Sequence, residues 1–156
     1  MKKVIATSAL PGAGKSYLAD KLQKKAIKDG FTSVICCTDD FFTVDGQYKW
    51  DFNFLSAGHE WCYGQFALAM FRETNLIIIA NTSLQAWNLY KYADLSSKIG
   101  YEFEVVEPKT DWRYDVAECA KRNNHNVPLA TIEKMHKGRE SAKDIEKELK
   151  AKFNLV

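Results

Sequence analysis

The hydrophobic pattern alternates short apolar runs with longer segments in which apolar residues recur every three or four positions. The short runs are typical of β-strands and the periodic segments of amphipathic helices. The pattern predicts strands at residues 4–6, 34–37, 76–80 and 101–106. It predicts helices at residues 15–28, 53–72, 82–98, 111–121, 129–136 and 140–152. This β-α-β order predicts a parallel sheet with helices on both faces, joined by right-handed crossovers.

Polar residues mark two of the predicted helix starts. Asn53 is placed to cap the second helix, and Thr82 with Gln85 has the spacing of a capping box at the third. The run 76–80 is apolar throughout, which favours a central strand that is covered on both faces.

Length and composition indicate a single domain. A chain of 156 residues can bury its own core without disulfides or metal. Its net charge of +2 argues against a general polyanion-binding coat, so any nucleic-acid contact would come from a local patch. The longest apolar run is too short to cross a membrane and no signal peptide is visible, so we expect a cytoplasmic protein without membrane contact.

The cysteines give no sign of a metal site. Cys36, Cys37, Cys62 and Cys119 form no CxxC pair, and the three histidines lie at no metal-ligand spacing beside them. We interpret them as buried free thiols in a reducing compartment.

The segment after the first predicted strand carries the strongest motif. Residues 9–16 fit the P-loop pattern G-x-x-x-x-G-K-[ST] except at Ala9, which replaces the first glycine. Gly12 and Gly14 allow successive N–H groups to face one anion, and the following helix adds its positive end. Lys15 would reach the outer phosphates and Ser16 would offer its hydroxyl to Mg²⁺. The motif therefore predicts ATP and Mg²⁺ as cofactors. The predicted nucleotide-binding residues are Pro11, Gly12, Ala13, Gly14, Lys15, Ser16 and Tyr17, together with Arg122 further along the chain. The alternative, a glycine-rich turn before a surface helix, would leave the coincidence of strand, loop, Lys-Ser and helix without a cause.

Acidic residues follow the second predicted strand. Ligands of open α/β sheets sit beyond the carboxyl ends of the strands, so Asp39 or Asp40 could accept a proton from an attacking hydroxyl. The alternative is a polar pair that caps a strand end. The third predicted strand ends in Ala80, where many P-loop enzymes carry an acidic residue for Mg²⁺. Asn81 or Thr82 could bind the metal through water, but neither supplies the missing charge.

A candidate lid lies at residues 122–128. Arg122 precedes a polar loop, and a mobile cation that closes over phosphates would stabilise the charge of the transition state. An arginine at a helix C-terminus, where the dipole favours it, is an equal alternative.

An aromatic cluster follows the acidic pair. We interpret it as core beneath a long loop, with stacking on a nucleobase as the alternative. Its members are Phe41, Phe42, Tyr48, Trp50 and Trp61.

On these residues the sequence resembles the phage-type polynucleotide 5′-kinases and the related P-loop proteins called AAA-domain or zeta-toxin-like. The resemblance covers roughly residues 1–136. Its matching positions are 11–16, 38–42, 46, 48, 50–51, 59–62, 81–82, 87, 90, 100–101, 121–123, 125 and 127–128.

The resemblance implies a kinase-like P-loop NTPase fold, a three-layer α/β/α domain with about four parallel strands and the third strand beside the first. It implies phosphoryl transfer from ATP to a hydroxyl. Lys15 and Ser16 would then bind phosphate and Mg²⁺, Asp39 would be the general base, and Arg122 would belong to the lid.

Three positions depart from the phage-type pattern. Those enzymes carry an arginine where Phe42 stands, an aspartate where Ala80 stands, and a further lid arginine where residues 123–126 offer none. The first hypothesis is a kinase that acts on the 5′-hydroxyl of a polynucleotide. The second is a kinase for a nucleoside or sugar, and the third is a nucleotide-binding or partner-binding module without catalysis. The sequence leaves the oligomeric state open.

Overall fold

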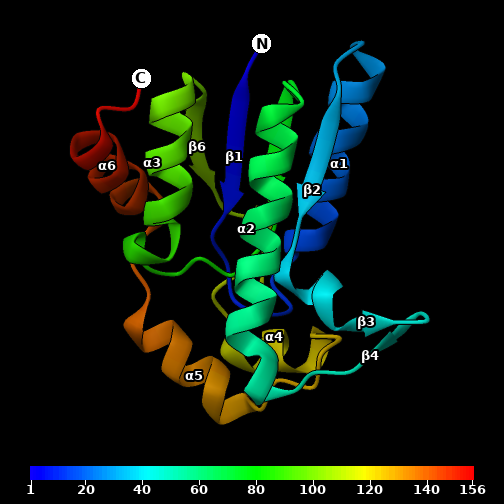
Figure 1. Cartoon of the computed structure of the whole chain (residues 1–156). Helices are drawn as coiled ribbons and strands as arrows, with labels where there is room; N and C mark the ends of the chain where they lie inside the picture. The colour runs from blue at the N-terminus through cyan, green and yellow to red at the C-terminus, as the bar shows by residue number, and fades with distance from the viewer.

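The computed structural model describes residues 1–156, which form three layers, helix on sheet on helix (Figure 1). The central sheet has four parallel strands in the order β2-β5-β1-β6. These strands are β1 (Lys3–Thr7), β2 (Ser33–Cys36), β5 (Leu76–Ile79) and β6 (Glu102–Val106). The predicted fold class is confirmed, and so is the expectation that the third predicted strand, β5, lies beside the first.

The remaining elements surround this sheet. The α-helices are α1 (Lys15–Lys28), α2 (Leu55–Phe71), α3 (Tyr90–Ile99), α4 (Val116–Arg122), α5 (Leu129–Gly138) and α6 (Ala142–Phe153). The short 3₁₀ helices are η1 (Thr38–Phe42), η2 (Phe52–Phe54) and η3 (Ala86–Leu89). A two-stranded antiparallel hairpin consists of β3 (Thr43–Val44) and β4 (Gln47–Tyr48). No helix of the structure is long and apolar enough to cross a membrane.

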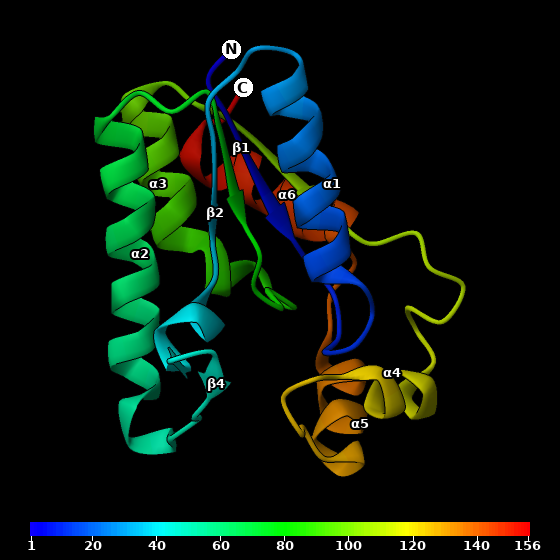
Figure 2. The same cartoon turned by 90° about the vertical axis from the view of Figure 1, so that its right-hand side faces the viewer.

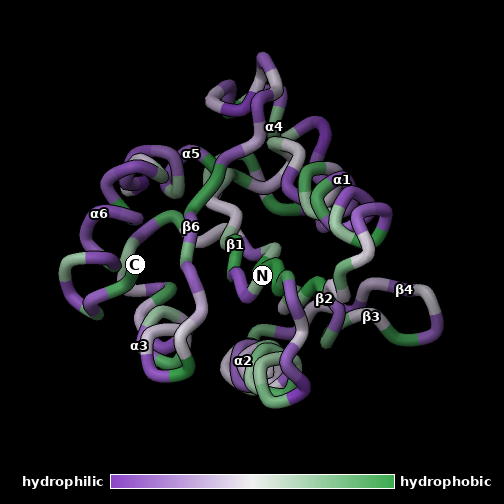
Figure 3. The backbone as a smooth tube through the Cα atoms, turned by 90° about the horizontal axis from the view of Figure 1, so that it is seen from above, coloured by the Kyte–Doolittle hydropathy of each residue, from purple (hydrophilic) through white to green (hydrophobic).

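The two faces of the sheet build two separate cores. Side chains alternate along a strand, so Val4 and Ala6 of β1 face one layer while Ile5 faces the other. The larger core packs the sheet against α2, α3 and α6, and the smaller one against α1. Figures 2 and 3 show α1 on one side of the strands and α2 with α3 on the other. Strand β5 is buried along its whole length, as its unbroken apolar run predicts.

Two helix starts differ from the prediction. Asn53 does not cap α2; Asp51 accepts a hydrogen bond from the Asn53 N–H and opens η2, which leads into the helix. Thr82 is not part of a capping box either. Gln85 and Asn88 form it reciprocally around η3, because the chain turns at Ser83 (φ 44°) and the helical turn begins only at Ala86.

Helix α4 is shorter than predicted. Residues 111–114 form turns, and the helix begins only after Asp115, whose carboxylate accepts from the Glu118 N–H. An aspartate side chain that bonds the backbone two or three residues on is typical of an N-cap, so it ends the turn and starts the helix.

The cysteines are free, and their thiols are buried except that of Cys37, which is half-buried. Burial raises the pKa of Cys36 and of Cys37, in each case to about 12. The raised pKa makes Cys36 and Cys37 poor nucleophiles, and the prediction of buried free thiols is confirmed for Cys36, Cys62 and Cys119.

Candidate active site

The loop between β1 and α1 has the backbone of an anion cradle. Gly12 (φ 80°) and Gly14 (φ 108°) both take left-handed conformations. A Cβ on Gly12 would lie 2.1 Å from the carbonyl oxygen of Cys119, so both the conformation and the contact with α4 require glycine there. The N–H groups of Gly12, Gly14, Lys15 and Ser16 find no acceptor within the chain. They are the donors that a phosphate would use.

The segment after β6 holds this loop from behind. Thr110 donates its hydroxyl to the Ala13 carbonyl at 2.8 Å, and the Trp112 indole donates to the Gly12 carbonyl at 3.1 Å. Because these donors occupy the loop's carbonyl oxygens, the opposite, N–H side of the loop is left for an anion.

Lys15 supplies the cation at the start of α1. The side chain is half-buried and makes no ion pair or hydrogen bond within the chain. Burial lowers the pKa of its ammonium, and the charge of Asp39 only partly offsets this. A desolvated cation without a counter-ion is stabilised by an anionic ligand. Tyr17, predicted to bind nucleotide, is 72% exposed on the same first turn.

A magnesium ion fits this site on the donor set. Ser16 is exposed beside the cradle, and Mg²⁺ typically takes one protein hydroxyl, phosphate oxygens and water. The end of β5 adds no charge: Ala80 is buried, and the Asn81 amide oxygen accepts from the Thr38 N–H at 2.9 Å. Asn81 therefore fastens β5 to η1.

Asp39 lies opposite, in η1 beyond the end of β2. Its Oδ1 accepts from the Tyr48 hydroxyl at 3.2 Å, and its Oδ2 lies 3.3 Å from His125 Nε2. The rings of Tyr48 and His125 contact each other, with centroids 4.0 Å apart. Burial first, and then the Asp39 charge, raise the pKa of Tyr48 far above its ordinary range, so its hydroxyl stays a donor. The carboxylate is still 42% exposed and can be reached from solvent.

Two of these residues were missed as site residues by the sequence reasoning. Tyr48 comes from the hairpin, whose turn residues Asp45 and Gly46 both take positive φ as a type I′ turn requires. His125 comes from the predicted lid, where the sequence analysis noted only that no second arginine is present. Its position two residues after Asn123, which can fold a tight loop, is the sequence feature that could have indicated its role.

The predicted lid loop is folded by that asparagine. The Asn123 side chain accepts from the His125 and Val127 N–H groups and donates to the Ala120 and Val127 carbonyls. An Asn side chain that replaces backbone partners in this way fixes a tight loop. His125 is thereby presented to Asp39 from the loop that follows α4, the helix whose Cys119 carbonyl lies against Gly12.

Arg122 lies near the cradle but is engaged elsewhere. Its Nε is 2.7 Å from Glu118 Oε1, and its guanidinium carbon lies 3.7 Å from the centre of the Trp112 ring. Trp112 in turn bonds Gly12. The structure thus places the arginine one side chain away from the P-loop, at the C-terminal end of α4 where the dipole favours a cation.

Asp40 has a different environment from its neighbour. Partial burial, and then the charge of Asp39, raise the pKa of its carboxyl. No hydrogen bond from Tyr48 or His125 reaches it, so only Asp39 of the predicted pair is held toward the cleft.

The aromatic cluster divides into core and surface. Phe42 is buried and packs on Gly58 of α2, where a Cβ would lie 2.9 Å from its ring. Trp50 is 53% exposed and Trp61 37% exposed, so the core interpretation is right for Phe42 and wrong for Trp50. The position that carries arginine in the phage-type enzymes therefore points into the domain here.

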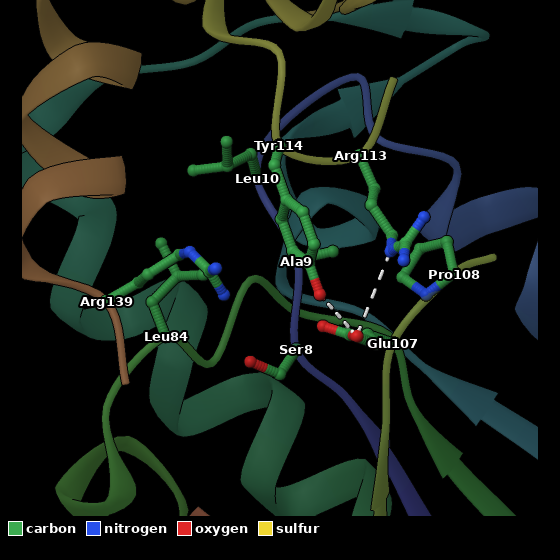
Figure 4. A pocket seen from close by; sticks show the side chains of 9 residues that line it. All are labelled: Ser8, Ala9, Leu10, Leu84, Glu107, Pro108, Arg113, Tyr114 and Arg139. Atoms are coloured by element: carbon green, nitrogen blue, oxygen red, sulfur yellow. Dashed lines mark hydrogen bonds and ion pairs between the residues drawn. The ribbon is translucent and has the colours of Figure 1, made fainter. Parts of the chain in front are cut away.

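A small pocket behind the P-loop is separate from this site (Figure 4). The Tyr114 ring lies between the guanidinium groups of Arg113 and Arg139, at 4.6 and 4.3 Å, and its hydroxyl bonds Glu107. The lining residues are Ser8, Ala9, Leu10, Leu84, Glu107, Pro108, Arg113, Tyr114 and Arg139. Neither Lys15 nor Asp39 is among them.

Comparison with known proteins agrees with this geometry. The sequence pattern of the family described as "AAA domain" matches residues 4–142. The chain belongs to this family. AAA domain proteins of this kind are P-loop kinase-like proteins, so the resemblance seen in the sequence is confirmed.

Relatives of this AAA domain chain are larger proteins. It is 41% identical over 126 residues to human NEDD4-binding protein 2, which covers 81% of this chain and 7% of that protein. A chain of the Pnkp1/Rnl/Hen1 RNA repair complex has the same fold, with a TM-score of 0.65 and 19% identity over 97% of this chain and 46% of that one. The Mycobacterium tuberculosis APS kinase CysC, in complex with AMPPNP and APS, matches with a TM-score of 0.53 and 16% identity over 78% of this chain and 68% of that one. The chain thus spans less than half of the first two proteins.

Proposed function

We propose that this chain is an ATP-dependent kinase that transfers the γ-phosphate to the 5′-hydroxyl of a polynucleotide. The observation that carries the proposal is the Asp39 carboxylate, which Tyr48 and His125 contact and whose charge acts on the Lys15 ammonium. A positioned carboxylate beside a phosphate cradle is what a hydroxyl acceptor needs. The fold shared with a chain of an RNA repair complex supports a nucleic-acid acceptor.

The P-loop holds the donor. The free N–H groups of Gly12, Gly14, Lys15 and Ser16 bind the phosphates, and the Lys15 ammonium neutralises their outer oxygens. The exposed Tyr17 lies on the same turn, beside the nucleotide. Ser16 would hold Mg²⁺, which supplies charge neutralisation between the β- and γ-phosphates when bound. ATP relieves the desolvated charge of Lys15, so binding energy and positioning come from the same contact.

Asp39 handles the proton. The acceptor oxygen attacks the γ-phosphorus while its proton passes to a carboxylate oxygen of Asp39. The bond from that phosphorus to the bridging oxygen breaks, and ADP leaves with the electron pair. The Tyr48 hydroxyl donates to Oδ1, while Oδ2 lies 3.3 Å from His125 Nε2 and accepts weakly from the Cys37 thiol at 3.9 Å. These contacts fix the orientation of the carboxylate and leave a lone pair on Oδ1 for the incoming hydroxyl.

Arg122 would act as the lid cation. In the present structure Glu118 holds it, so contact with the phosphates requires this i,i+4 pair to open. Surface pairs of this kind are weak, about 0.3–0.5 kcal/mol, and an ATP phosphate would compete well for the guanidinium.

Two other functions remain open. A kinase for a nucleoside or sugar is favoured by Phe42, which leaves η1 without a cation for an acceptor phosphate. A nucleotide-binding or partner-binding module without catalysis is favoured by Ala80, because β5 ends without an acidic residue.

Labelled ATP separates these functions. The protein is incubated with γ-labelled ATP, Mg²⁺ and 5′-hydroxyl DNA or RNA oligonucleotides, and in parallel with a panel of nucleosides and sugars. We expect label on the oligonucleotide, lost in Lys15→Ala and Asp39→Ala but kept in the matched controls Lys21→Ala and Asp40→Ala. Label on a small acceptor alone would replace the first function with the second. ATP binding without any labelled product would leave only the binding module.

A further inference from the structure

Aromatic side chains form a continuous path from the catalytic carboxylate to the surface. Tyr48 bonds Asp39, the Phe42 ring lies 6.4 Å from the Tyr48 ring, and Phe41 lies 5.1 Å from Phe42. Trp61 follows at 6.1 Å from Phe41 and is partly exposed on α2. The path therefore joins the proton acceptor to the outer face of that helix.

Three further aromatic residues lie exposed on the segment that leads into α2. Trp50 and Phe52 have ring centroids 6.2 Å apart and are 53% and 70% exposed. Phe54 precedes α2 and Trp61 lies two turns along it, so both share the face of Gly58, the residue on which Phe41 and Phe42 pack. We call Trp50, Phe52, Phe54 and Trp61 the aromatic surface.

This surface is poor in positive charge. Lys49 is the one lysine or arginine between the hairpin and residue 61, against Asp51 and Glu60, and burial lowers the pKa of His59 in the same segment. A ligand held here by its phosphates would want arginines or lysines, whereas flat π-faces suit nucleobases. The buried Phe42 removes the other place from which η1 could offer a cation.

We propose that the aromatic surface is the binding site for the acceptor strand, a single-stranded polynucleotide whose bases stack on Trp50, Phe52 and their neighbours while its 5′ end lies at Asp39. The proposal rests on the proposed kinase function and adds to it the mode of substrate recognition. Single strands are required because bases paired in a duplex do not expose their faces. The strand is held mainly by stacking, so its affinity depends weakly on salt.

The test measures binding and turnover separately. Anisotropy of labelled 5′-hydroxyl DNA and RNA oligonucleotides gives affinity without ATP, and kinase assays give KM for acceptors from a nucleoside 3′-phosphate to an eight-residue strand. The variant is Trp50→Ala/Phe52→Ala. Its matched control is Phe71→Ala, an exposed aromatic (87%) at the opposite end of α2.

We expect the wild-type KM to fall as the acceptor grows, and the double variant to lose about tenfold or more of affinity for long single strands. Its KM for ATP and for the nucleoside 3′-phosphate should stay unchanged, as should every value for Phe71→Ala. Far-ultraviolet circular dichroism shows that each variant is folded. A similar loss of affinity for DNA and for RNA would support binding by base stacking alone. A loss limited to one of them would support base stacking at a site that also distinguishes ribose from deoxyribose.

Three results would overturn the proposal. One is equal oligonucleotide affinity in wild type and double variant. Another is a steep salt dependence with no preference for single strands. The third is a wild-type dimer that dissociates in the double variant, which would show that a second copy covers the surface. If the protein is an active kinase and the double variant behaves as wild type, only the proposed role of the aromatic surface is rejected. If the protein binds single strands but transfers phosphate to no acceptor, the kinase proposal is rejected and the binding site stands.

Discussion

The two walls of the candidate site, the P-loop and the segment around Asp39, are built in opposite ways. The P-loop wall is local: four of the five residues 12–16 provide free N–H groups, and Lys15 adds an unpaired cation from the same short stretch of chain. The Asp39 wall is assembled: its carboxylate is engaged by Tyr48 from the hairpin and His125 from a loop 86 residues further along the sequence. One wall therefore has donors waiting for a ligand, and the other has partners that set the direction of a single side chain.

The difference indicates where each wall is sensitive. A cradle of backbone donors keeps its shape when one side chain changes, so replacing Lys15 should remove charge but not architecture. A carboxylate held by two distant side chains depends on the packing of three segments. On the P-loop wall we therefore expect one substitution, that of Lys15, to have a large effect on activity. On the Asp39 wall we expect several substitutions with effects on activity that range from large to small.

Replacing Lys15 should have the largest effect. In Lys15→Ala the cation at the outer phosphates is gone, and we expect kcat/KM to fall by about a thousandfold or more. ATP should also lose most of its ability to raise the melting temperature. Lys21→Ala, on the exposed face of the same helix, is the control and should behave as wild type. Unchanged transfer in Lys15→Ala would mean that residues 9–16 are not the donor site.

Without nucleotide, the same lysine lowers the stability of the folded protein, although it favours ATP binding. Its pKa in the folded protein lies below 10.5, so the unfolded chain binds the proton more tightly. Keeping the buried Lys15 ammonium charged destabilises the folded protein. This destabilisation is complete below the folded pKa and disappears as pH rises toward 10.5. Urea unfolding of Lys15→Met should therefore show higher stability than wild type at neutral pH, with the gap closing at high pH. A constant gap across the series would contradict a desolvated ammonium.

Replacing Asp39 should come next. Asp39→Asn keeps the shape and one oxygen that can accept from Tyr48, but it removes the base, and we expect kcat to fall by about a hundredfold to a thousandfold. ATP affinity should be preserved, because the nucleotide's donors lie on the other wall. Asp40→Asn is the control, since no residue of the opposite wall contacts it. An equal loss in both variants would point to a structural role of η1.

Much of this contrast follows from how the sequence encodes the two walls. Helix α1 begins at Lys15 and ends at Lys28 as predicted, because glycines, a Lys-Ser pair and apolar periodicity are local signals. Strand β5 was equally readable from its unbroken apolar run. The roles of Tyr48 and His125 were not, because each depends on a tertiary contact: a hairpin folding back on η1, and a loop closed by Asn123.

The capping residues of two helices were predicted wrongly for a related reason. Several side chains near residues 51–53 and 82–88 can accept a backbone N–H, and the path of the chain decides which one does. Asp51 and Gln85 are the N-caps, rather than Asn53 and Thr82, because the short helices η2 and η3 come before α2 and α3. Pattern reasoning detects that a cap is present better than it identifies the residue.

The partners of Asp39 should show a smaller, graded effect. His125→Ala removes the imidazole that lies 3.3 Å from the carboxylate, and Tyr48→Phe removes the hydroxyl that donates to it. We expect about ten- to thirtyfold losses in kcat with little change in the KM for ATP. His125→Gln keeps an N–H that can reach Asp39 and should recover part of the activity. In the Asp39→Asn background, adding His125→Ala should cost little, because the two residues act as one unit. Additive losses would place His125 on the phosphates instead.

The pair of Glu118 and Arg122 sets the smallest expected effect and decides how the lid takes part. Glu118→Ala frees the Arg122 guanidinium from its ion pair, so a phosphate no longer has to displace a carboxylate. Exposed pairs of this kind contribute a fraction of a kcal/mol, which predicts a gain in kcat/KM of about two- to threefold. Arg122→Ala should lower kcat/KM in both the wild-type and the Glu118→Ala background. Titration with ATP at low and moderate salt measures the gain, which should shrink as salt screens the pair. If Glu118→Ala has no effect and Arg122→Ala only lowers the melting temperature, then Arg122 braces Trp112 behind Gly12, and charge on the γ-phosphate is met by Lys15 alone.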